Sequence, residues 1–145
     1  MLYGAVLRNE QLMFKFVFHA VVVAMVATTS VAKPALRDVP AIDDALLAVG
    51  LADEIRKQCP KVSARFIKAL RFVSGLRDKA RDMGYTDAEI DAYRKSPKEK
   101  ARVRAKGEAY LAANNVTVGN IESYCALGRA EIKKSSQIGA LLRVN

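Results

Sequence analysis

Apolar residues recur at helical spacing through most of the chain after residue 41. The first predicted helix carries four aliphatic positions near the three- and four-residue spacing of one helix face, namely Ile42, Leu46, Val49 and Ile55. Pro60 marks its end, because proline lacks a backbone donor and disfavours helical geometry in the residue before it.

The second predicted helix has the clearest pattern. Its apolar side chains form a stripe along one face: Val62, Phe66, Leu70, Val73, Leu76, Ala80 and Met83. Gly84 follows directly and can adopt the left-handed conformation that often ends a helix. The pattern therefore predicts a helix from Val62 to Met83.

Two helix start signals follow. Thr86 and Ser96 are each followed by a glutamate at the spacing of the capping box, in which a hydroxyl and a carboxylate bind free N–H groups. The first predicts a short helix. The second has Pro97 at the favoured first helical position and predicts a helix to about Ala113. That helix should stop at Asn114-Asn115, since asparagine tolerates left-handed backbone geometry.

The last predicted helix begins at a cap on Asn120 and runs through Ile132. The tail offers three aliphatic residues that can dock on a core, Ile138, Leu141 and Leu142. No alternation of apolar and polar residues is long enough to predict a strand. The pattern as a whole predicts an all-α fold, a small single-domain bundle of four or five helices.

The segment before these helices has the order of a secretory signal peptide. Lys15 precedes an apolar run from Phe16 to Ala27, and small residues at Ser30 and Ala32 suit a cut after Ala32. The alternative is a transmembrane anchor. It needs roughly 20 apolar residues, more than this run contains.

Three parts of the chain follow from this pattern. We predict a signal peptide over residues 1–32, an N-terminal arm over 33–41 and a helical domain over 42–145. A start at Met13 would place Lys15 close to the N-terminus and give a signal peptide of ordinary length, so Met13 is an alternative start.

Charge and composition then limit the partners. The chain has 145 residues and a net charge of +9. Loss of residues 1–32 removes two basic residues and one acidic residue, which leaves about +8. The single histidine, His19, is lost as well. We expect a periplasmic protein, and because that compartment holds no chromosomal nucleic acid, we expect no nucleic-acid partner.

Both cysteines, Cys59 and Cys125, lie in the predicted mature chain. An even cysteine count in a small exported domain indicates a disulfide. A redox pair would usually show C-x-x-C spacing, and a metal site would need further cysteine or histidine ligands. The mature sequence has neither, so we predict one structural disulfide, no metal and no cofactor.

The sequence RKSPKEKARVRAK, residues 94–106, holds seven Lys or Arg and one Glu. On a helix, Lys98, Arg102 and Lys106 would form one row. Lys100 and Arg104 would form another on roughly the opposite side. One interpretation is a solvated helix whose basic side chains lie along apolar surface. The other is a basic surface that attracts an acidic protein or anionic headgroups.

Candidate catalytic groups are sparse. Asp87, Glu89 and Asp91 cluster, but helix capping explains two of them better than a glycosidase-like acid and base pair. The serines of the mature chain have no histidine to activate them. We predict no catalytic residues, and an enzyme built on Tyr, Lys and carboxylates remains an alternative.

Five strings together resemble an uncharacterised family of small exported alphaproteobacterial proteins. They are ADEIRKQCP (52–60), GYTDAEIDAY (84–93), EKARVRAKGEAYLA (99–112), ESYCALGRAEI (122–132) and SSQIGALL (135–142). The resemblance implies a signal peptide, a helical domain and a cysteine pair at Cys59 and Cys125. It also implies genes near those of respiratory NADH dehydrogenase and hence an accessory role, without an assigned activity.

These observations favour a periplasmic helical protein, monomeric or weakly associating, that acts by binding an unknown protein partner. The first alternative is a membrane-associated accessory factor, for example of a respiratory complex, that uses its basic surface. The second is an enzyme of unrecognised type. Salt separates the first two, because screening near about 0.5 M NaCl should abolish attachment by charge alone.

Overall fold

The computed structural model describes residues 32–145, so the predictions for the signal peptide and for Met13 fall outside the described residues. Residues Lys33–Asn145 form one compact unit. Its elements in chain order are η1 (Leu36–Asp38), α2 (Pro40–Gln58), β1 (Val62–Ala64), α3 (Phe66–Asp82), α4 (Asp87–Lys95), α5 (Pro97–Ala113), α6 (Ile121–Lys133), α7 (Gln137–Ala140) and β2 (Leu142–Val144).

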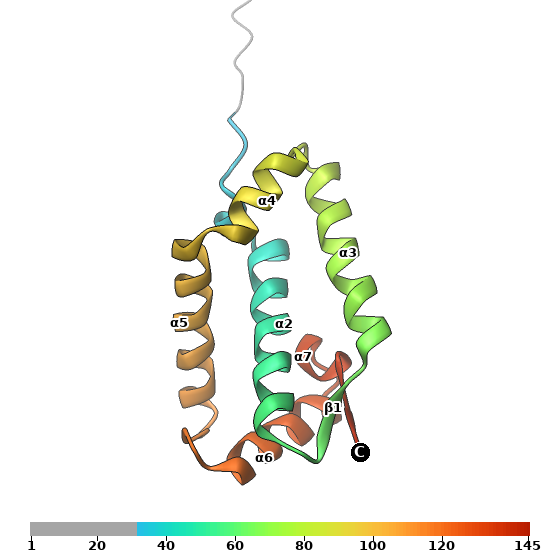
Figure 1. Ribbon diagram of the computed structural model, residues 1–145, viewed down its shortest axis with the longest axis vertical. Helices are drawn as coiled ribbons and strands as arrows, with labels where there is room; N and C mark the ends of the chain where they lie inside the picture. The colour runs from blue at the N-terminus through green and yellow to red at the C-terminus, as the bar shows by residue number, and fades with distance from the viewer. Residues whose placement is uncertain (1–31) are drawn as a thin grey trace, which may run out of the picture. The chain divides into compact units, whose positions relative to one another are not determined.

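α2 is the central element of this unit (Figure 1). α5 runs along one side of it and α3 along the other, and α4 connects α3 to α5 at one end. α6, α7 and the short strands lie at the other end of α2. The prediction of a small all-α bundle is confirmed, and the helix beyond the predicted four or five is the four-residue α7.

The main core lies where α2 meets α6, α7 and the strands. Its most deeply buried side chains are Ile55, Cys59, Cys125 and Leu142. α6 comes very close to α2 at Gly128, where an added Cβ would lie only 2.9 Å from Cγ2 of Ile55. The predicted docking of the C-terminal tail is also confirmed, because its three aliphatic side chains are buried in this core.

A second, smaller core lies at the other end of α2. Leu36 and Val39 pack there against Ala80 of α3 and Tyr85 before α4. The segment 33–41, expected as an arm, therefore contributes buried side chains. α2 begins at Pro40 rather than at residue 42, because proline suits the first helical position.

The prediction that the second helix starts at Val62 was wrong. Val62–Ala64 forms a strand that pairs antiparallel with Leu142–Val144, and α3 begins only at Phe66. Three residues are too few to show the two-residue alternation of a strand. The pairing also joins segments about 80 residues apart, which no local pattern can reveal.

The predicted helix ends agree with the structure. Gly84 has a positive φ of 86° directly after α3, and Asn115 has a φ of 58° after α5. Asn120 caps α6 by accepting a hydrogen bond from the backbone N–H of Ser123. These signals depend only on residues close in sequence.

Candidate binding groove

A buried carboxylate in the first turn of α2 holds α5 in place. Asp43 is only 1% exposed, and its carboxylate accepts hydrogen bonds from the guanidinium of Arg102 and, at 2.6 Å, from Nζ of Lys106. The hydroxyl of Tyr93, on α4, donates another at 2.9 Å. Three helices therefore meet at one acceptor, and two cations compensate its buried charge.

Glu99 is a second buried carboxylate in the same cluster. Nε of Arg102 donates to it at 2.8 Å, and Arg37 forms an ion pair with it, also at 2.8 Å. The predicted capping box at the start of α5 is therefore only half formed. The Ser96 hydroxyl accepts from the backbone N–H of Glu99 at 3.3 Å, but the Glu99 side chain binds the arginines, since charge-assisted hydrogen bonds are stronger.

The charges in this cluster shift the ionisation of its members. The hydrogen bond from Arg102 holds the pKa of Asp43 well below its usual range, although burial opposes the shift. Burial raises the pKa of Tyr93 to about 12, and the hydrogen bond to Asp43 adds to the effect. At neutral pH the carboxylate is therefore ionised and the phenol keeps the proton that it donates.

The C-terminal half of α5 is held by Glu131 of α6, which is fully buried. The hydroxyl of Tyr110 donates to Glu131 Oε1 at 2.7 Å, and Nζ of Lys134 lies 2.6 Å from the same oxygen. Ser136 donates to the other oxygen. Burial alone would raise the pKa of Glu131, but the three donors outweigh burial and lower it.

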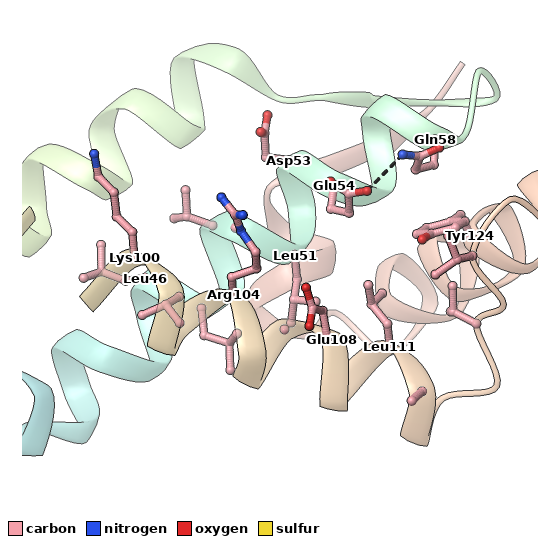
Figure 2. Close-up of a pocket in the computed structure, with 18 of the residues that line it drawn as sticks. Leu46, Leu51, Asp53, Glu54, Gln58, Lys100, Arg104, Glu108, Leu111 and Tyr124 are labelled. Atoms are coloured by element: carbon pink, nitrogen blue, oxygen red, sulfur yellow. Dashed lines mark hydrogen bonds between the residues drawn. The ribbon is translucent and has the colours of Figure 1, made fainter. Parts of the chain in front are cut away.

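An open groove of about 950 Å³ lies between α2 and α5 (Figure 2). The main apolar side chains of its lining come from α2, α5 and α6: Leu46, Leu47, Leu51, Val103, Leu111 and Tyr124. Gly107 of α5 faces α2, and an added Cβ there would lie 3.8 Å from Leu47 Cδ1. The volume is within the range of roughly 300–1,000 Å³ that is usual for binding sites.

Charged side chains border this groove (Figure 2). Lys100, Arg104 and Glu108 follow one another at helical spacing along α5. None of these three forms an ion pair with another residue in the part of the chain that the structure describes. On the α2 side, Asp53 and Glu54 are bound by side chains of their own helix. Because Gln58 is neutral, Glu54 keeps its charge, so the uncompensated charges beside the groove are those of α5 and of Glu54.

The five predicted basic residues occupy two sides of α5. Arg102 and Lys106 bind the buried carboxylate of α2. Lys100 and Arg104 border the groove, and Lys98 is exposed. Lys100 and Arg104 therefore lie together at the groove, whereas Arg102 and Lys106 attach α5 to α2.

The carboxylates at the start of α4 have structural roles. Thr86 and Glu89 form the complete predicted capping box, and the hydrogen bond from the Thr86 backbone lowers the pKa of Glu89 to about 2. Asp87 and Asp91 form ion pairs with Arg77 of α3. This arrangement supports the capping interpretation over an acid and base pair.

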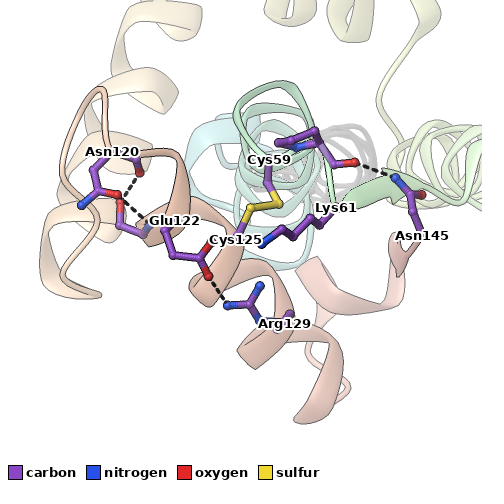
Figure 3. Close-up of a disulfide and its surroundings, with 9 residues drawn as sticks. Cys59, Lys61, Asn120, Glu122, Cys125, Arg129 and Asn145 are labelled. Atoms are coloured by element: carbon purple, nitrogen blue, oxygen red, sulfur yellow. Dashed lines mark hydrogen bonds and ion pairs between the residues drawn. A yellow bond between two sulfur atoms is a disulfide. The ribbon is translucent and has the colours of Figure 1, made fainter.

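The predicted disulfide between Cys59 and Cys125 is confirmed (Figure 3). Both cysteines are fully buried, with a Cα–Cα distance of 5.1 Å. The bond joins the residue after α2 to the first half of α6. Beside it, Glu122 forms ion pairs with Arg129 at 2.6 Å and with Lys61 at 3.4 Å (Figure 3).

The sequence pattern did not reveal Asp43 or Glu131 as buried anchors of α5. Asp43 lies 59 residues before Arg102, so no local spacing connects the two. The face of α5 that borders the groove did have a signal, because Lys100, Arg104 and Glu108 repeat at four-residue spacing.

Residues 32–145 contain neither a membrane-spanning helix nor a cluster of metal-binding side chains. No helix there is both long enough and apolar enough to cross a membrane. Within the same range, no three His, Cys, Asp or Glu side chains lie together so that they could bind a metal ion.

The chain matches the model of a family described as a family of unknown function (DUF5333), over residues 34–143. It belongs to this family. The DUF5333 match covers every element from η1 through α7, both cysteines and the whole groove, and it confirms the resemblance to an uncharacterised family. Neither a curated protein nor a solved structure matches the chain.

Proposed function

We propose that this member of the DUF5333 family is an exported, periplasmic binding protein, not an enzyme, whose groove between α2 and α5 takes the apolar face of an amphipathic helix of a protein partner. The observation that carries the proposal is the open apolar groove beside unpaired charges of α5. An amphipathic helix that lays its apolar face into such a groove is a recurrent mode of recognition.

The dimensions and charges of the groove define the partner segment. α5 has 17 residues and is about 25 Å long, so a partner helix of four to five turns would lie along it. Apolar residues at i, i+3, i+4 and i+7 would fill the groove. Acidic residues on the partner would lie near Lys100 and Arg104, and a basic residue near Glu108.

The polar clusters around the groove favour binding over catalysis. The carboxylates of Asp43 and Glu131 are each bound by three different donor residues, so neither is available as a base. Ser136 donates to Glu131 and also caps α7. These groups fix α5, α6 and α7 relative to α2, which preorganises the groove.

Export is the second part of the proposal. The compact unit begins at Lys33, the residue that follows the predicted cut, and Nζ of Lys33 donates to the carbonyl oxygen of Gly84 at 2.5 Å. A buried disulfide also suits an oxidising compartment. The N-terminal peptide of protein isolated from the periplasm should begin at Lys33. An N-terminus at Met1 or Met13 would contradict the proposed cleavage.

A membrane-associated accessory factor remains the second candidate, which the basic side chains Lys98, Lys100 and Arg104 favour. Its support is weaker on α5, because Arg102 and Lys106 are already neutralised there by a buried carboxylate. An accessory role in a respiratory complex fits groove binding if the partner helix belongs to a subunit of that complex.

Site-specific cross-linking tests the groove. A photoreactive phenylalanine analogue at Val103 faces the groove, and the same analogue at Ala105 lies on the exposed side of α5. In intact cells of the source organism, position 103 should give an adduct to a polypeptide, and mass spectrometry should map it to an amphipathic helical segment. Position 105 is the matched control in the same helix and should give none.

The other outcomes of this experiment contradict the proposal. No adduct at position 103, or equal adducts at 103 and 105, would remove the groove as a partner site. An adduct of position 103 with a lipid would mean that the groove binds a small amphiphile and not a protein helix.

A substitution in the groove provides a further test. Leu47→Arg places a longer, charged side chain in the groove, so the adducts from position 103 should disappear.

A further inference from the structure

Part of α3 is apolar where it faces solvent. Four of its residues near the N-terminal end, Phe66, Ile67, Leu70 and Val73, are 68%, 61%, 54% and 41% exposed. We call these four residues the α3 stripe. α3 packs on the unit with other side chains, and only Ala80 of the helix is fully buried. A continuous apolar patch of this kind indicates an interaction surface.

The chain around the α3 stripe is strongly basic. From Ile55 to Arg77 the sequence holds seven Lys or Arg and no Asp or Glu. Within residues 32–145, Lys68 and Arg71 of α3 form no ion pair. Four other cations of this segment, Arg56, Lys57, Lys61 and Arg77, form ion pairs with acidic residues outside it. Lys68 and Arg71 therefore leave uncompensated positive charge beside the α3 stripe.

We propose that the α3 stripe inserts into the surface of a bilayer that contains anionic phospholipid, while the flanking cations interact with the headgroups. A helix with Phe and Leu on one face and Lys and Arg on the other typically lies in the plane of the interface. The attachment is peripheral, because insertion involves one face of α3 only. α3 lies at the edge of the unit, connected through β1 and α4, and its outer face is accessible (Figure 1).

A bilayer suits this surface better than a second copy of the chain. In a twofold dimer the same patch meets itself, so the cations of one copy would face those of the other. An anionic bilayer supplies an apolar layer and the opposite charge together. The α3 stripe and the groove lie on different helices, so bilayer binding does not depend on the proposed partner helix.

Sedimentation with vesicles tests the proposal. The disulfide-bonded unit Lys33–Asn145 should bind vesicles of phosphatidylcholine with about one quarter phosphatidylglycerol, and it should not bind pure phosphatidylcholine. Lys68→Gln with Arg71→Gln should weaken binding about 30-fold, roughly fivefold for each cation. Phe66→Ser with Leu70→Ser should weaken it at least tenfold.

Matched controls separate a local surface from net charge. Lys98→Gln with Lys133→Gln removes the same charge away from α3 and should change binding less than twofold. Val118→Ser removes an apolar side chain that is 90% exposed elsewhere and should also have little effect. If the control variants lose as much vesicle binding as the α3 variants, net charge alone explains binding and the proposal is overturned.

A tryptophan probe distinguishes insertion from adsorption. The chain has no tryptophan, so Phe66→Trp introduces a single tryptophan, which can be excited selectively, in the α3 stripe. Its emission should shift to shorter wavelength with anionic vesicles, whereas that of Val118→Trp should not. No shift, or a protein that stays in solution with anionic vesicles, overturns the proposal. Concentration-dependent dimerisation that Phe66→Ser abolishes would assign the α3 stripe to a second copy.

The groove serves as an independent reference in these assays. Leu47→Arg should leave vesicle binding unchanged and abolish cross-linking from position 103. Phe66→Ser with Leu70→Ser should weaken vesicle binding and leave cross-linking from position 103 unchanged. Failure of one proposal is therefore visible without failure of the other.

Discussion

Asp43 neutralises the basic side chains on one side of α5. Its carboxylate and that of Glu99 are buried beside Arg37, Arg102 and Lys106, so two negative charges lie among three positive ones. Most of the charge on this side of α5 is therefore compensated inside the molecule. A burial of this kind is tolerated only while every charged group keeps its partners.

We expect Asp43→Asn to lower the free energy of unfolding by about 3 kcal/mol. The amide keeps the shape of the carboxylate but leaves two cations without their buried counter-ion. Urea unfolding at pH 7 measures the difference. Asp44→Asn is the control, because Asp44 is exposed and has no ion pair among the described residues, and it should change the stability by less than about 0.5 kcal/mol.

The difference in the free energy of unfolding between wild type and Asp43→Asn should depend on pH. Asp43 has a lowered pKa in the folded state, and an unfolded aspartate titrates near about 3.9. The stability it contributes is therefore complete above about pH 4 and is lost as the pH falls toward the lower folded value. The difference between wild type and Asp43→Asn should shrink on acidification below about pH 4. A difference that is constant down to pH 2 would contradict this assignment.

Gly139 is required for the packing of α7 on α6. An added Cβ would lie 1.9 Å from the carbonyl oxygen of Glu131, a contact that only backbone movement could relieve. Gly139→Ala should lower the free energy of unfolding by about 3 kcal/mol. Gly50→Ala on α2 meets no atom within 4 Å and should raise it by up to about 1 kcal/mol. Thermal unfolding of the two variants should shift in opposite directions.

At the level of elements, the position of α5 relative to α2 decides how wide the groove is. Gly107→Ala places a methyl group in ordinary contact with Leu47 and Leu51. It should stabilise α5 by up to about 1 kcal/mol but narrow the groove, and cross-linking from position 103 should fall about tenfold. Gly75→Ala on α3 should give the same gain in stability with unchanged cross-linking. Equal cross-linking in both variants would contradict the proposed contact.

The elements that the sequence predicts correctly are those with local signals. Thr86 with Glu89, the Ser96 and Pro97 start, and the Asn120 cap each act within one helical turn. The two cysteines were predictable as a pair because the composition, together with the predicted export, limits the alternatives. These signals are enough for the helix ends of α4, α5 and α6, for the fold class and for the disulfide.

The features that the sequence does not predict depend on residues far apart along the chain. The pairing of β1 with β2 and the contact of Asp43 with Arg102 connect distant segments. The apolar spacing of α3 predicts a helix correctly, yet it does not show that Phe66 and Leu70 would remain exposed. Periodicity indicates an apolar face, but the tertiary fold determines whether anything covers it.

For the whole molecule, the disulfide connects parts that the chain itself keeps far apart. Cys59 and Cys125 are separated by 66 residues, and that loop contains β1, α3, α4 and α5. Both sides of the groove and the α3 stripe therefore belong to α2 or to this loop. The bond restricts the unfolded chain strongly, because the entropy lost on closing a loop increases with its length.

Replacement of both cysteines by alanine should lower the free energy of unfolding by about 4 kcal/mol. The denaturant dependence should become steeper, because an unfolded chain without the cross-link exposes more surface. Urea unfolding with and without dithiothreitol measures both quantities. Reductant should move the wild-type curve toward that of the double variant and leave the variant unchanged. Coincident wild-type curves under the two conditions, with the bond shown by mass to be reduced, would mean that native contacts alone maintain this fold.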